Sequence, residues 1–364
     1  MPENIKPIQK ILFGSPGTGK SYQIREIARD KLGIPFDEAT KMLSNTVKTV
    51  FHPEYTYADF MGKLLPLTQG TSIIYKFYPG HFIRILGMAY KGLIEGNKEH
   101  YLLVIDELNR GNAAAIFGTV FQLLDRESDG WSSYEVDISE MELVGLLEAI
   151  NLKPIIQDGT IEIKEENTKR PCEDFCKLKK DELASENPDG SRVFSLLQQR
   201  RINIPHNLSI LATINTSDES IYYLDSAFKR RWDWEYVKAP VKDASIPKEL
   251  QDVKLIINGE PQGTWSQYIV GINELIKSNH QVIRRIEDKQ IGWWFIKPED
   301  NQVDLEQVKD KLMFYLWDSV FARDKRPIEE FLSESDKAVK LTAYSDFLDL
   351  MQEFMRKVGE RGKK

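Results

Sequence analysis

Short apolar runs alternate with longer amphipathic stretches through the first two thirds of the chain. The runs rich in β-branched and aromatic residues predict strands at residues 8–13, 47–52, 101–105, 208–214 and 234–238. Between them, apolar residues at three- and four-residue spacing predict helices that begin near Gly19, Tyr57, Gly80, Asn112 and Tyr223. Strands that alternate with helices are typical of a parallel sheet wrapped by helices. The pattern therefore predicts an α/β fold with a nucleotide-binding layout.

A polar, charge-rich stretch interrupts this order between about residues 128 and 205. The stretch includes residues 164–170 and 185–191, and we interpret it as an insertion between two core strands, partly helical at residues 141–150 and partly loop. The insertion is a candidate surface for a partner or for DNA. Because its basic residues are mixed with many acids, a solvated decoration is an equally good interpretation.

The strand pattern fades after Pro240, and the remaining periodicity is helical. Amphipathic helices are expected at residues 265–276, 305–321 and 343–358, and the basic end at residues 356–364 is expected to be frayed. The chain is thus predicted to form an α/β domain at residues 1–240 and a smaller α-helical lid domain at residues 241–364.

Composition narrows the class of protein. With 41% hydrophobic and 29% charged residues the chain is expected to be globular. It has neither a long apolar span nor a signal-peptide pattern, so we expect a cytoplasmic protein without membrane association. The net charge of −7 does not suit a protein that coats nucleic acid, so any DNA contact must be local. Cys172 and Cys176 have no nearby histidine and are interpreted as free thiols.

One glycine-rich segment fits the phosphate-loop pattern. It follows an apolar strand, opens a helix, and consists of Gly14, Ser15, Pro16, Gly17, Thr18, Gly19, Lys20 and Ser21. In such loops the backbone N–H groups turn inward around the phosphates, where the helix N-terminus adds partial positive charge. Lys20 would reach the β- and γ-phosphate oxygens, and Ser21 would be a Mg²⁺ ligand. The alternative, a glycine turn that only caps a helix, does not explain this context.

Polar residues follow two further apolar strands. Asp106 and Glu107 end the strand at 101–105, where Asp106 would bind Mg²⁺ and Glu107 would polarise the attacking water. Asn215 ends the strand at 208–214, where its amide would orient that water or sense the γ-phosphate. Taken alone, the acids also suit a turn or a helix cap, and Asn215 suits an Asn/Asp turn. The phosphate loop upstream favours the functional interpretation.

A short helix is expected to begin ten residues after Asn215, at Asp225, and to end in three cations, Lys229, Arg230 and Arg231. Cations at that position complement the helix dipole without any ligand. Alternatively, Arg230 or Arg231 would reach a neighbouring subunit's site and stabilise transition-state charge there.

Together these motifs resemble the AAA+ superfamily, and in detail the McrB family, the GTP-hydrolysing motors of modification-dependent restriction systems. The similar segments are residues 51–60, 105–112, 212–218 and 224–231, and residues 290–295 resemble a lid segment of the family. The resemblance implies that Asn215 and Asp218 act in hydrolysis and that Arg230 and Arg231 are trans-acting candidates, with Arg231 preferred. In the lid segment, Trp293 and Trp294 replace smaller polar residues.

The resemblance also implies partners. It suggests a head-to-tail ring, most simply a hexamer, with nucleotide between neighbours and with a McrC-like nuclease subunit docked on the ring. DNA would be reached through the ring or that partner, because the phosphate loop begins too early for a preceding recognition domain. GTP is implied by the resemblance alone, and ATP stays open. The alternatives are an ATP-driven MoxR-like remodelling chaperone and a scaffold that binds nucleotide without hydrolysing it.

Overall fold

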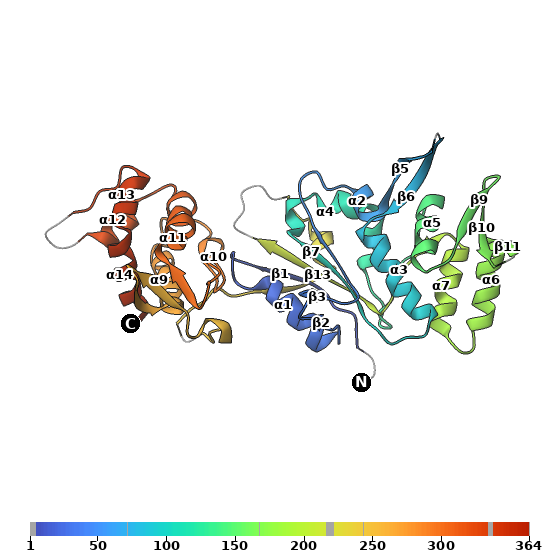
Figure 1. Cartoon of the computed structure of the whole chain (residues 1–364), viewed down its shortest axis with the longest axis horizontal. Coiled ribbons are helices and arrows are strands. Elements are labelled where there is room, and N and C mark those ends of the chain that lie inside the picture. Colours follow the sequence, from blue (N-terminus) through green and yellow to red (C-terminus); the bar gives the residue numbers. More distant parts are fainter. Residues whose placement is uncertain are drawn as a thin grey trace. The chain divides into compact units, whose positions relative to one another are not determined.

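The chain divides into two compact units, shown in Figure 1. This computed structural model describes residues 5–70, 72–166, 168–215, 222–242, 244–333 and 338–363. The first unit is drawn from Met1–Leu12, Ser21–Ile214 and Ser220–Glu235, and the second from Phe13–Lys20, Asn215–Glu219 and Tyr236–Lys364. The phosphate loop therefore groups with the C-terminal part of the chain.

A five-stranded sheet forms the centre of the first unit. Its strand order is β14-β1-β13-β7-β4, with bounds Asp233–Tyr236, Gln9–Gly14, Leu208–Asn215, Tyr101–Asp106 and Thr46–Val50. β7 pairs in parallel with both β4 and β13. All but the last residues of β7 and β13 are buried, as expected for strands covered on both faces. The α/β expectation is confirmed, and each predicted strand region contains a strand.

Helices cover this sheet. They are α1 (Lys20–Glu26, continued by π-turns at Ile27–Lys31), α2 (Tyr57–Met61), α3 (His81–Ile94), α4 (Ala113–Phe117), α8 (Ser226–Lys229) and 3-10 turns at Leu108–Arg110 and Gly118–Leu124. Thr56 begins α2 through a capping box with Asp59. Phe51, Phe60 and Phe117 are fully buried beside it, so the aromatic segment after β4 supplies core packing.

The insertion is more regular than expected. It contains α5 (Glu140–Ala149), α6 (Cys172–Leu183) and α7 (Pro188–Gln198), an antiparallel sheet of β9 (Pro154–Gln157), β10 (Thr160–Glu165) and β11 (Thr168–Pro171), and the pair β8 (Val136–Asp137) and β12 (Arg201–Ile202). Two short hairpins precede it, β2 with β3 (Phe36–Asp37, Met42–Leu43) and β5 with β6 (Gly62–Gln69, Ser72–Pro79).

The polar segment at residues 185–191 contains the start of a helix, α7. Asn187 accepts a hydrogen bond from the Gly190 amide, and Pro188 occupies the first turn, where its missing N–H costs nothing. α6 and α7 pack side by side (Figure 1) and bury both cysteines, whose Sγ atoms lie 3.9 Å apart as free thiols. Polar composition here reflected exposed helix faces rather than loop.

The second unit is mainly helical around its own core. Its helices are α9 (Trp265–Ser278), α10 (Ile286–Lys289), α11 (Leu305–Gln307, continued by π-turns at Val308–Met313 and Leu316–Val320), α12 (Arg326–Leu332), α13 (Tyr344–Asp349) and α14 (Met351–Lys363), with a 3-10 turn at Lys248–Leu250. α9 and α14 approach closely because Gly271 and Gly362 carry no Cβ, which would lie 2.3 Å from the Val358 oxygen and 2.0 Å from the Gln267 oxygen.

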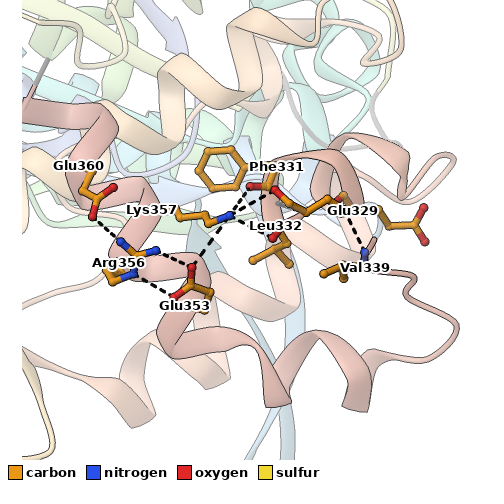
Figure 2. A network of polar contacts seen from close by, with 9 residues as sticks. Glu329, Phe331, Leu332, Val339, Glu353, Arg356, Lys357 and Glu360 are labelled. Carbon is orange, nitrogen blue, oxygen red and sulfur yellow. Dashed lines mark hydrogen bonds and ion pairs between the residues drawn. The ribbon is translucent and has the colours of Figure 1, made fainter. Parts of the chain in front are cut away.

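Two expectations for this unit were wrong. The strand pattern after Pro240 does not fade, because β15 (Lys254–Ile257), β16 (Glu260–Thr264) and β17 (Gln302–Asp304) form a small sheet. The basic end is not frayed either, since α14 runs to Lys363. Figure 2 shows the reason: Arg356 pairs with Glu353 and Glu360, and Lys357 donates to the carbonyls of Phe331 and Leu332 at the end of α12. In the described part of the chain, no helix is long and apolar enough to cross a membrane.

A buried arginine, Arg126, connects separate segments of the first unit through hydrogen bonds. The guanidinium of Arg126 donates to the carbonyls of Gly130, Ile204, Pro205 and Leu208 at 2.9–3.1 Å. Burial lowers its pKa to about 9, so it remains charged at neutral pH. These bonds join the start of β13 to the segment after the second 3-10 turn.

Replacing Arg126 by methionine is expected to destabilise the fold, because four carbonyls lose a charged donor. We expect a loss of about 3 kcal/mol, or about 6 to 12 °C in thermal midpoint. The matched control is Arg201→Ala, which removes exposed ion pairs with Asp137 and Glu135 and should leave the midpoint almost unchanged. Equal midpoints for the two variants, measured by circular dichroism, would contradict this role.

Candidate nucleotide-binding site

The phosphate loop connects β1 to α1 through a tight turn. Gly17 and Gly19 have φ values of 73° and 91°, a left-handed region that favours glycine. Thr18 Oγ1 donates to the Ser15 carbonyl at 2.9 Å, which closes the turn. Gly17 and Gly19 are therefore required by the backbone geometry of the turn.

Lys20 is the first residue of α1 and is almost fully buried. Its ammonium donates to the carbonyls of Gly14 and Ser15 at 2.8 and 2.9 Å. A buried ammonium needs such partners, because desolvation disfavours its charge. The side chain folds back over its own loop, where a bound phosphate would compete with these carbonyls for the ammonium.

The acidic pair lies in the first unit, at the end of β7. Asp106 Oδ2 forms an ion pair with the Lys48 ammonium on β4 at 2.6 Å, and Asp106 Oδ1 accepts a hydrogen bond from Thr213 Oγ1 at 3.1 Å. Glu107 has left-handed backbone angles, φ 55° and ψ 45°, and precedes the 3-10 turn at Leu108–Arg110. Strained backbone of this kind in a non-glycine residue persists where the surrounding structure determines it, often at functional sites.

Thr213 connects the two acids. Its hydroxyl donates to Asp106 Oδ1 and accepts from the Glu107 amide at 3.2 Å. The contact follows from the parallel register, which sets Ala212 of β13 beside Ile105 of β7. The hydroxyl is buried, so neither bond is exposed to competition from bulk water.

Asn215 is the last residue of β13 and is partly exposed. Asp218, the other residue of that segment to which we gave a role, lies outside the described residues. The Asp106 carboxylate and the Ser21 hydroxyl are oxygen groups of the chemical kind that Mg²⁺ prefers. Among the described residues, no group of three or more His, Cys, Asp or Glu is arranged to hold a metal by itself.

The two arginines after α8 differ in their surroundings. Arg231 pairs with Asp125 Oδ2 through Nε at 3.0 Å and Nη2 at 2.8 Å, and its guanidinium lies 4.0 Å from the centroid of the Phe121 ring. Arg230 is exposed, and within the described residues its guanidinium makes no hydrogen bond or ion pair. The Arg231 guanidinium is thus held by contacts within its own chain. The Arg230 guanidinium is exposed and can contact another molecule.

Comparison with known proteins finds similar restriction enzyme components. The chain is 28% identical over 355 residues to the BsuMI type II restriction enzyme component YdiS of Bacillus subtilis, covering 90% of this chain and 83% of that protein. It is 24% identical over 224 residues to the EcoKMcrB subunit of an Escherichia coli type IV methyl-directed restriction enzyme, covering 62% of this chain and 34% of that subunit. The chain is thus similar to two restriction enzyme components, one of which is an McrB subunit.

No protein-family model matches the chain. The solved structures that match this chain include a putative ATPase of Cytophaga hutchinsonii, at 10% identity and a TM-score of 0.26, and the match covers 95% of this chain and 84% of the other. A second is PCH-2 of C. elegans, at 12% identity and a TM-score of 0.22, covering 98% of this chain and 62% of the other.

Two residues of this candidate site were missed in the sequence. Thr213 stands in an apolar strand, two residues before Asn215, and a hydroxyl residue so close to the end of that strand was a usable signal. Lys48 is an ordinary cation on an edge strand, and only the pairing of β4 with β7 brings it to Asp106.

Removing the Thr213 hydroxyl tests its connection to the acids. Thr213→Val keeps the shape of the side chain but frees the Asp106 carboxylate and the Glu107 amide. If they act in hydrolysis, the turnover number should fall about 10- to 100-fold. Nucleotide affinity should change little, because the loop at residues 14–21 is untouched.

Thr49→Val is the matched control, since Thr49 is also buried, on the neighbouring strand β4, opposite Ile105. Both variants are compared by steady-state phosphate release and thermal midpoint. Equal activity losses would assign Thr213 a purely structural role.

Proposed function

We propose that this chain is the motor subunit of a restriction system, an AAA+ NTPase that hydrolyses GTP in preference to ATP. The observation that carries the proposal is the arrangement of Asp106, Thr213 and Glu107 in a chain that also has a complete phosphate loop. Similarity to two proteins named as restriction enzyme components supports the biological setting.

The triphosphate would be bound by the loop at residues 14–21. Its backbone amides and the Lys20 ammonium are suitable donors for phosphate oxygens. Ser21 and Asp106 are proposed to hold Mg²⁺, which neutralises charge on the phosphates when bound. Asp106 is held in place by Thr213 while Lys48, which is half exposed, can withdraw.

Glu107 is proposed as the residue that polarises the attacking water, and Asn215 as the residue that orients it. Asp218 is proposed to assist Asn215. A carboxylate that takes a proton in the transition state contributes about 10²- to 10⁴-fold in rate. Glutamine at residue 107 keeps the size of the side chain but cannot accept that proton.

We further propose a head-to-tail ring, most simply a hexamer, in which the site is completed by a neighbouring subunit. A heterologous interface of this kind closes on itself when its rotation fits. A McrC-like nuclease subunit is proposed to dock on the ring, and DNA would be reached through the ring or that subunit. The insertion at about residues 128–205 is a candidate surface for such contacts.

Phosphate release with GTP and with ATP tests the central proposal. Wild type should turn over GTP faster than ATP, and the co-encoded nuclease subunit should accelerate it. Glu107→Gln should lower turnover by about 10²-fold or more while nucleotide affinity is retained. Turnover of ATP alone, indifferent to the nuclease subunit, would instead favour a MoxR-like remodelling chaperone. Nucleotide binding without turnover would favour a scaffold.

The arginines make a second prediction, which revises the preference for Arg231. Arg230→Ala should abolish most turnover without lowering the thermal midpoint, because its exposed guanidinium makes no hydrogen bond or ion pair with the residues that the structure describes. Arg231→Ala should lower the midpoint, because it breaks the pair with Asp125.

Mixing variants separates action in trans from action in cis. Subunits with Arg230→Ala keep an intact site but lack the donated arginine, whereas Glu107→Gln subunits keep the arginine. Mixed rings of the two should regain part of the turnover that neither has alone. No recovery in confirmed mixed rings would place Arg230 outside the trans-acting role.

A further inference from the structure

The phosphate loop is hydrogen-bonded along its backbone to the lid segment, which we define as Gly292–Phe295. Both belong to the second unit. The Gly292 amide donates to the Pro16 carbonyl at 2.9 Å, and the Trp294 amide donates to the Gly17 carbonyl at 2.8 Å. Ser15 Oγ also donates to the Glu287 carbonyl. Three successive loop residues are therefore tied to the C-terminal part of the chain.

The two backbones are in direct contact, which only glycine permits. A Cβ on Gly292 would lie 2.1 Å from the carbonyl carbon of Gly17. A Cβ on Gly17 would lie 2.5 Å from the Phe295 nitrogen, and φ of Gly17 is also in the left-handed region. Beside this contact, the Trp294 indole comes within 3.5 Å of the Cβ position of Gly19.

The lid segment is itself held rigidly. Asn273 on α9 is buried; its Nδ2 donates to the Ile291 carbonyl at 2.9 Å and its Oδ1 accepts from the Ile291 amide at 2.8 Å. On the other side, the rings of Phe295 and Tyr315 lie 4.8 Å apart. The segment is thus anchored to α9 and to the helical stretch after α11.

The direction of the hydrogen bonds has a consequence for the loop amides. In a trans peptide the C=O and N–H groups point in opposite directions. Because the lid segment binds the Pro16 and Gly17 carbonyls, the amides of Gly17 and Thr18 point away from it. Backbone amides aimed the same way are the donors that a phosphate-binding loop requires.

We propose that Gly292–Phe295 is a positioning element that holds the phosphate loop in its nucleotide-binding shape, with the Trp294 indole as a wall beside Gly19. The inference rests on the proposed nucleotide binding and names lid residues on which that binding depends. It also makes Trp294 a reporter of the loop, because an indole beside a site changes its emission when the neighbouring charge or solvent changes.

Gly292→Ala tests the positioning role, because its added methyl must displace the loop backbone. The dissociation constants of fluorescent GTP and ATP analogues should rise roughly 10- to 100-fold, the loss expected for misplaced donors to a charged ligand. The matched control is Gly271→Ala, whose methyl meets the Val358 oxygen at 2.3 Å in the same unit but away from the loop. It should lower the thermal midpoint without weakening nucleotide binding.

Trp294→Phe provides a second readout that a structural role alone would not move. GTP or ATP should change the tryptophan emission of wild type and of Trp317→Phe, a variant at a partly buried residue that packs against the core of the same unit. The change should be absent in Trp294→Phe. Persistence of the change in Trp294→Phe would overturn the role of Trp294 as the wall of the site.

The outcomes separate this inference from the proposed function. Wild type that binds neither nucleotide would overturn the proposed function itself. Wild type that binds, together with Gly292→Ala that binds equally well, would overturn the positioning role alone. Weakened binding in Gly292→Ala but not in Gly271→Ala supports it.

Discussion

The parallel pairing of β7 with β4 and β13 is the constraint on which the acidic part of the site depends. Three strands that run the same way end at one edge, so residues more than a hundred positions apart become neighbours. Thr213 reaches both Asp106 and Glu107 only because of this register, and a slip of one residue would turn its hydroxyl to the other face. Complete burial of β7 and β13 makes such a slip costly.

A second constraint acts on the loop. Parallel strands need long crossover connections, and these carry the helices and the insertion of the first unit. The loop after β1 is different, because its carbonyls are bonded to Gly292–Phe295. Its shape is therefore determined by contacts with residues nearly 280 positions later, as well as by its own glycines. The phosphate loop is recognisable from consecutive residues, but its shape also depends on hydrogen bonds to residues far away in the sequence.

The sequence predicted what depends on local pattern. Long apolar runs such as 101–105 and 208–214 became central strands, and the glycine motif became a tight loop. Polar segments were harder to interpret. In the sequence, α7 and the end of α14 resemble a loop and a tail because their exposed faces are charged. α14 is helical at its end because acids and bases alternate at helical spacing around Arg356. The strands β15–β17 are too short to stand out by periodicity.

Contacts across strands could not be predicted in the same way. Lys48 and Asp106 are adjacent only in the folded sheet, yet their pair shapes the site. One oxygen of the Asp106 carboxylate is fixed by the buried Thr213 hydroxyl. The other oxygen pairs with the half-exposed Lys48 ammonium, a partner that can be exchanged. The ammonium compensates the charge of Asp106 while no cation is near, and its long side chain can withdraw into water at little cost. Such an arrangement keeps the Asp106 carboxylate oriented while leaving one of its oxygens open to exchange of partners.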